Sequence, residues 1–129
     1  MVGDWVLWGM HKGHYFGTEI GEIWWKRYIR GGMFARGIGE YWYDENCFNF
    51  RRYLTRKPIT LRYQQMIELK TGRWHGGKWG GGFPIIKIIW KKNDVRLSSG
   101  FLLATDRERS DKILQELQDY IDRARQAGD

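Results

Sequence analysis

Apolar and polar residues alternate along most of the chain in short runs, and turn-forming residues separate these runs. Residues 18–29 are rich in β-branched and aromatic side chains, which are typical of strands, and the pair Gly31-Gly32 suits a two-residue hairpin turn. Residues 33–43 are then expected to form the return strand. Within this strand Gly37 and Gly39 share one face, a spacing that predicts close approach of another backbone or a sharp bend.

Further strands are predicted downstream of this hairpin. Residues 47–53 alternate between apolar and polar positions after a turn at residues 44–46, and residues 59–61 and 67–70 form two shorter alternating pieces. Residues 85–90 and 95–103 are expected to pair as a hairpin across Asn93-Asp94. On its second strand, period-two spacing directs four apolar residues toward the core: Val95, Leu97, Phe101 and Leu103.

The last part of the chain has a helical period instead. Residues 105–108 fit a capping box, in which Thr105 accepts from the amide three residues on and Glu108 reaches back. Apolar residues then recur at helical spacing, at Ile113, Leu114, Leu117, Ile121 and Ala124. These features predict a helix over residues 105–127 that ends near Gly128. Because such a helix is unstable alone, packing against the sheet must hold it.

About seven short strands followed by one amphipathic helix predict an α+β fold. We expect a strongly bent antiparallel β-barrel whose open end is capped by the C-terminal helix. The length of 129 residues fits a single domain, residues 1–129. Residues 1–16 contain glycines that interrupt every periodic pattern together with aromatic residues that favour burial, so they are expected to form a short strand or an N-terminal arm.

Charge and composition narrow the range of partners. The formal net charge is +7, and 16% of the residues are aromatic. The single cysteine excludes an internal disulfide framework and fits a reducing compartment. No signal peptide is evident, and the longest apolar run, residues 83–90, is too short to span a membrane. We therefore expect a cytoplasmic protein that is soluble or peripheral to a membrane, with no transmembrane segment; the oligomeric state is left open.

One stretch resembles a known superfold. Residues 37–50 combine glycine, strand, acidic turn and a strand ending in aromatic residues, which is similar to the pleckstrin-homology-like superfold and, within it, to GRAM-type domains. The apolar pair Ile67 and Leu69 agrees, as does the final hairpin that leads into the capped helix, so the resemblance covers residues 18–125. Another small barrel capped by a helix is the alternative fold.

The resemblance implies a module that binds membranes, lipids or proteins and is not an enzyme. Members that bind phosphoinositides place basic residues around the turn of the first hairpin, and this chain has four basic residues there. It departs from the pattern in having one basic residue after the turn where two are expected, which argues against specific inositol-phosphate recognition. The four residues are Lys26, Arg27, Arg30 and Arg36.

A glycine-rich segment, residues 72–82, is the most unusual feature of the sequence. It lacks the Gly-Lys-Ser/Thr ending of a P-loop and the context of a dinucleotide-binding fingerprint. It carries Trp74 and Trp79 together with Arg73, His75 and Lys78. Exposed indoles here would enter a membrane interface, stack on bases or contact a protein partner. Alternatively, both indoles fold back onto the sheet and the glycines provide turns.

Other clusters carry less information. Residues 51–57 are basic and, with Arg62, suit either contact with a nucleic-acid backbone or the protection of a strand edge. His11 and His14 would need His75 nearby to form a metal site, and three histidines without paired cysteines are weak support for one. Cys47 shows no sign of being a nucleophile. We expect no metal and no cofactor.

The resulting interpretation is a non-enzymatic binding module for an anionic membrane surface or an acidic protein partner. Single-stranded nucleic-acid binding is one alternative, and self-association or scaffolding through the N-terminal arm is another. An enzyme is the least supported class, and only a buried pocket that holds His75 beside a carboxylate would favour it. The expected ligand-binding residues are Lys26, Arg27, Arg30, Arg36, Arg73, Trp74, Lys78 and Trp79.

Overall fold

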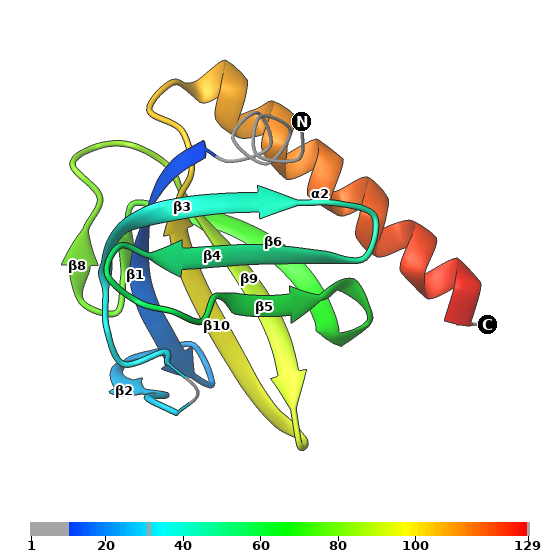
Figure 1. Ribbon diagram of the computed structural model, residues 1–129, viewed down its shortest axis with the longest axis horizontal. Helices are drawn as coiled ribbons and strands as arrows, with labels where there is room; N and C mark the ends of the chain where they lie inside the picture. The colour runs from blue at the N-terminus through cyan, green and yellow to red at the C-terminus, as the bar shows by residue number, and fades with distance from the viewer. Residues whose placement is uncertain (1–10, 31, 129) are drawn as a thin grey trace.

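The computed structural model describes residues 11–30 and 32–128. Eight strands form one antiparallel sheet in the order β5-β4-β3-β1-β10-β9-β6, with β2 paired to β1, and β7 and β8 form a separate two-stranded ribbon (Figure 1). The elements are β1 (His11–Ile20), β2 (Ile23–Arg27), β3 (Gly37–Tyr43), β4 (Cys47–Arg52), β5 (Ile59–Arg62), the 3₁₀ turn η1 (Tyr63–Gln65), β6 (Met66–Gly72), β7 (Trp74–His75), β8 (Lys78–Trp79), β9 (Ile85–Lys92), β10 (Val95–Leu102) and α2 (Arg107–Gly128).

The prediction of an α+β fold with a strongly curved antiparallel sheet and a C-terminal helix is confirmed, but a closed barrel of about seven strands is wrong. The described residues form ten strands, and the edge strands β5 and β6 do not pair with each other. The chain passes between them through η1 alone. Tyr63 of this turn fills the gap: its ring stacks on Tyr120 of α2 at a centroid distance of 5.3 Å, and its hydroxyl donates to the Asp44 carbonyl.

The first hairpin differs from the prediction. The chain turns at Gly21 and Glu22, both at positive φ, so that β2 folds back onto β1 before residue 29 is reached. The first half of β1 pairs instead with β3, which starts at Gly37 and not at residue 33. Gly31 of the expected turn, and residues 1–10 of the expected arm, lie outside the described residues, while residues 11–16 belong to β1.

Two glycine and turn predictions are confirmed. A Cβ on Gly39 would lie 2.2 Å from the carbonyl oxygen of Arg51, so β4 approaches β3 where only glycine fits. Asn93 and Asp94, both at positive φ, join β9 to β10. On β10, Leu97 and Phe101 are buried as expected, whereas Val95 is exposed because it directly follows the turn.

The helix α2 closes one end of the curved sheet (Figure 1). Its expected apolar stripe is confirmed, since Ile113, Leu117 and Ile121 are buried in the same core as the inward side chains of the strands. The expected cap at Thr105 is wrong: the Asp106 carboxylate accepts the Arg109 amide at 2.7 Å, one residue later. Asp is as strong an N-cap as Thr, and its position decides where the helix begins.

Buried hydroxyl groups link three neighbouring strands on the core side of the sheet. The hydroxyls of Thr18 on β1 and Ser99 on β10 are hydrogen-bonded at 2.7 Å, and the Trp90 indole N–H of β9 donates to Ser99 at 2.9 Å. Because Ser99 points into the core, its neighbours Ser98 and Gly100 point to the opposite face of the sheet. This opposite face is called the outer face below.

Candidate polar latch and pocket on the outer face

The glycine-rich segment folds over the outer face and is not a free loop. It contains the β7–β8 ribbon, which turns at Gly76 and Gly77 with φ of 58° and 80°. Both values lie in the left-handed region, where glycine has no Cβ penalty, so the pair fits a two-residue turn. The turn brings His75 onto β1 and β10, at the point where Glu19 pairs with Ser98 in the sheet.

His75 anchors this ribbon. Its side chain is buried and lies over Gly100, where a Cβ would come within 2.5 Å of the imidazole ring. Nε2 is 3.1 Å from the Gly17 carbonyl oxygen and 2.9 Å from that of Ser98, so Nε2 carries a hydrogen and donates. Burial, aided by the charge of Lys87, lowers the His75 pKa against the opposing effect of Glu19. The neutral imidazole is therefore the form that fits this position.

Glu19 and Arg36 hold the next residue of the ribbon. The Gly76 amide donates to Oε2 of Glu19 at 2.8 Å, and the Arg36 guanidinium donates to the Gly76 carbonyl at 3.1 Å. The same Oε2 atom lies 3.8 Å from Nδ1 of His75. We call His75, Glu19 and Arg36 the polar latch, since together they bond the glycine-rich segment to the body of the sheet.

His75 therefore lies beside a carboxylate in a pocket, which is the arrangement that would favour an enzyme. The bonding, however, is that of an anchor. Nε2 is engaged by two backbone carbonyls, and the Ser98 hydroxyl has no hydrogen-bond partner among residues 11–30 and 32–128. A Ser-His-Glu triad needs the serine hydroxyl bonded to the imidazole, and that bond is missing from the described residues. The arrangement can position a loop, and it shows no activated nucleophile.

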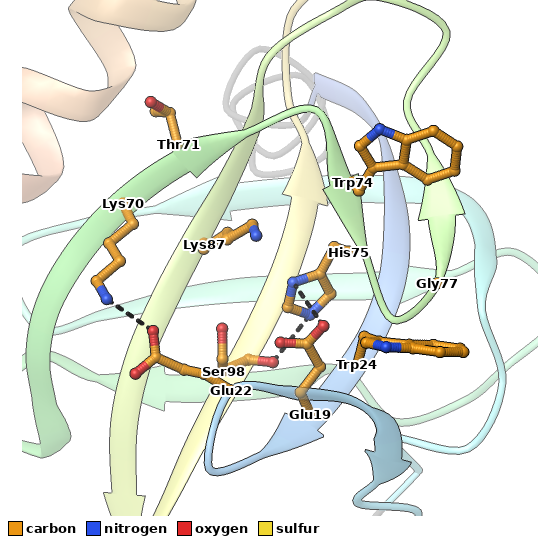
Figure 2. Close-up of a pocket in the computed structure, with 10 residues that line it drawn as sticks. All are labelled: Glu19, Glu22, Trp24, Lys70, Thr71, Trp74, His75, Gly77, Lys87 and Ser98. Carbon is orange, nitrogen blue, oxygen red and sulfur yellow. Dashed lines mark hydrogen bonds and ion pairs between the residues drawn. The ribbon is translucent and has the colours of Figure 1, made fainter.

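A pocket of about 720 Å³ opens above the latch (Figure 2). Its floor is Glu19, His75 and Ser98, and its walls include the indoles of Trp24 and Trp74. Lysines 70 and 87 lie on the side opposite the two indoles in this view. Lys70 is paired with Glu22 at 2.7 Å, and this contact lowers the Glu22 pKa.

The indoles of the β1–β2 hairpin and of the β7–β8 ribbon are exposed. Trp74 and Trp79 are 59% and 55% exposed, which contradicts the alternative in which both fold back onto the sheet. Trp24 and Trp25 of β2 are 60% and 64% exposed. The two hairpins are in contact, since a Cβ on Gly77 would lie 3.0 Å from the Trp24 ring.

The structure divides the expected basic residues into two groups. Arg27 and Arg36 are half-buried and bond backbone carbonyls, those of Phe34 and Gly76. The other four are exposed, and the Lys78 ammonium lies 5.8 Å from the centroid of the Phe16 ring. We call these four residues and the four indoles the aromatic–basic surface: Trp24, Trp25, Lys26, Arg30, Arg73, Trp74, Lys78 and Trp79.

Sequence reasoning missed Glu19, Lys87, Trp24 and Trp25 as site residues. Two adjacent tryptophans in a strand point to opposite faces, so at least one of Trp24 and Trp25 had to leave the core, and this signal was present. Nothing in the sequence placed Glu19 beside His75, because their contact depends on strand register. The basic residues 51–57 lie partly on strand β4, where the Arg51 guanidinium lies 3.6 Å from the Glu40 carboxylate of the neighbouring strand β3.

The three histidines lie in different surroundings. His11 contacts the Tyr41 ring and Arg109, and His14 packs against Phe16. In the part of the chain that the structure describes, no three His, Cys, Asp or Glu side chains are grouped as metal ligands would be. Within the same residues, no helix is both long enough and apolar enough to cross a membrane.

Comparison of the chain with protein-family models and with curated proteins finds no match.

Proposed function

We propose that this chain is a non-enzymatic binding module with a pleckstrin-homology-like fold that adsorbs to anionic membrane surfaces. The curved antiparallel sheet with its C-terminal helix supports the fold assignment. The observation that carries the functional assignment is the exposure of Trp74 and Trp79 on a ribbon that the polar latch holds in place.

The physical chemistry of the aromatic–basic surface favours a membrane interface. Indoles are amphipathic and concentrate at the headgroup level of bilayers. Each Lys or Arg near an anionic surface contributes about 1 kcal/mol of attraction. Exposed apolar side chains gathered in one place on a folded protein mark a contact surface. Here the latch bonds the ribbon that carries Trp74 and Trp79 to the sheet, so the ribbon loses little conformational entropy when the protein adsorbs.

Vesicle co-sedimentation tests this function. Wild-type protein is expected to pellet more strongly with vesicles that contain an anionic phospholipid than with phosphatidylcholine vesicles. Replacing the four basic residues of the aromatic–basic surface by Gln removes about 1 kcal/mol each and should weaken anionic binding at least tenfold. The double variant Trp74→Ala/Trp79→Ala should weaken binding to both vesicle types.

Two control variants change similar side chains elsewhere. Leu54→Ala removes a fully exposed apolar side chain from the loop between β4 and β5. Lys91→Gln removes an exposed charge at the C-terminal end of β9. Both should pellet as wild type. Equal pelleting with neutral and anionic vesicles, or no pelleting with either, contradicts the proposal and directs attention to an acidic protein partner or to single-stranded nucleic acid.

A further inference from the structure

The pocket above the polar latch has the size and composition of a small-molecule site. Its volume of about 720 Å³ lies within the range of roughly 300–1,000 Å³ that is usual for ligand pockets. It combines aromatic walls with a few charged groups, and its floor is more than nine-tenths buried: Glu19 is 5% exposed, His75 1% and Ser98 0%.

Two opposite charges in this pocket lack an ion pair. Glu22 and Lys70 neutralise each other at the rim. Glu19 uses Oε2 for the Gly76 amide, while its Oε1 has no partner among residues 11–30 and 32–128. Lys87 is half-buried and takes part in none of the ion pairs among those residues. A nearly buried carboxylate without full compensation is costly, so a group that pairs with it binds favourably.

The two charges lie at different ends of the pocket. In Figure 2, Glu19 lies near Trp24 and below Trp74, whereas Lys87 lies on the side of Lys70 and Thr71. Indole faces attract alkylammonium groups, by about 0.5–2 kcal/mol per contact. The indole end therefore suits a cation that Glu19 also attracts, and the lysine end suits an anion.

We propose that this pocket binds a small zwitterion of the alkylammonium phosphate class. The ammonium group lies between the two indoles and donates to Oε1 of Glu19, and the phosphate oxygens accept from Nζ of Lys87. The room in the pocket exceeds what an ammonium group alone would fill, which leaves space for the phosphate and the carbon chain. A phospholipid headgroup and a free phosphodiester share this chemistry.

Isothermal titration calorimetry with soluble glycerophosphoethanolamine tests the assignment on the full chain. Because this probe is soluble, its binding is independent of adsorption to membranes, and either proposal can fail alone. Ethanolamine and glycerol 3-phosphate each carry one charged end, and each is expected to bind at least tenfold more weakly than the probe. Lys87→Met and Glu19→Gln should also each weaken the probe at least tenfold, while Lys91→Met leaves its affinity unchanged.

The variants are chosen so that the fold survives. Gln at position 19 retains an oxygen that accepts the Gly76 amide, and Lys87 has no partner to lose among the described residues. Circular dichroism melting checks both. The proposal is overturned if the probe shows no binding at millimolar concentration, if single-ended compounds bind equally well, or if folded Lys87→Met binds like wild type. Where the probe binds, adding it to vesicle-bound protein separates the sources: release indicates a lipid headgroup, and retention indicates a free zwitterion.

Discussion

Two segments cover the curved sheet, and they are held by opposite kinds of interaction. The helix α2 closes one end by burying Ile113, Leu117 and Ile121 in the common core. The glycine-rich segment covers the outer face through hydrogen bonds of His75, Glu19 and Arg36, and it leaves its own indoles in solvent.

This difference separates what stabilises the protein from what presents its surface. Apolar burial is non-directional and scales with the buried area. The contribution of α2 to the stability of the protein therefore comes from its whole buried face and not from single oriented contacts. Hydrogen bonds of the latch contribute less each, about 0.5–1.5 kcal/mol, but they depend on direction and protonation. We therefore expect core variants of α2 to unfold the chain and latch variants to act on the outer face.

The largest expected effect is on the helix side of the comparison. Leu117→Ala removes a fully buried side chain from the core and should lower the free energy of unfolding by about 2–5 kcal/mol. Urea denaturation followed by circular dichroism measures this. Leu54→Ala, which changes the same side chain in full exposure, should stay within about 0.5 kcal/mol of wild type. Similar losses for both variants would contradict a core role for α2.

The next effect is on the latch. Gly100→Ala places a Cβ 2.5 Å from the His75 ring and should cost about 1–3 kcal/mol by overpacking. The same change in a His75→Ala background meets no ring, although the Cβ of residue 75 still lies 3.0 Å away, so its cost there should be clearly smaller. A double-mutant cycle from urea denaturation measures this coupling. Additive costs would show that His75 does not lie over Gly100 in solution.

A smaller effect is expected from pH. The His75 pKa is lowered in the folded protein, chiefly by burial, so below about pH 6.5 the unfolded chain binds more protons than the folded chain. Stability is then lost as the pH falls from about 6.5 through the folded pKa. Melting temperatures measured between pH 7.5 and pH 5 should decline in this window, and His75→Gln should flatten the decline.

His14 provides the control for this pH series. Its pKa is also lowered, by burial and by the charge of Lys78, but it lies outside the latch. His14→Gln should therefore leave the part of the decline that comes from His75. If the decline is unchanged in His75→Gln and absent in His14→Gln, the pH dependence comes from His14 and not from the latch, which contradicts this prediction.

The smallest effect concerns the exposed indoles. Trp74→Ala and Trp79→Ala should each change the free energy of unfolding by no more than about 0.5 kcal/mol, since neither side chain is buried. Acrylamide quenching of wild-type fluorescence compared with that of the double variant should show that the accessible emission component is lost. A large destabilisation would mean that these side chains help to hold the ribbon in place.

Periodicity predicted the helix side well. The stripe on α2, the Asn93–Asp94 turn and the strands around it all follow from local spacing, because each is decided by neighbours in the chain. The hairpin turn was misplaced because Glu22 adopts a positive φ that its residue type rarely shows, while Gly31-Gly32 offered a stronger local signal. A barrel was predicted wrongly because closure depends on how strongly the whole sheet curves, which the local spacing of residues does not decide.

The latch was out of reach of the sequence for the same reason. His75 and Gly17 are 58 positions apart, and only the register of β1 against β10 brings Glu19, Ser98 and Gly100 beneath the imidazole. The segment that carries Trp74 and Trp79 was identified from its glycines and aromatic residues, but its exposure depends on the latch. The residues that contact His75 on the outer face therefore could not be predicted from local sequence patterns.

The hydroxyl pair of Thr18 and Ser99 spans 81 positions of the chain, and it lies in the seam between the first described strand and the last. In a nascent chain that has been synthesised only as far as β9, strand β1 still lacks β10, the strand with which it pairs. Such high contact order makes folding slow and late, since the entropy of closing this loop is lost before the seam can form. The polar latch, which rests on that seam, is consequently among the last features to be assembled.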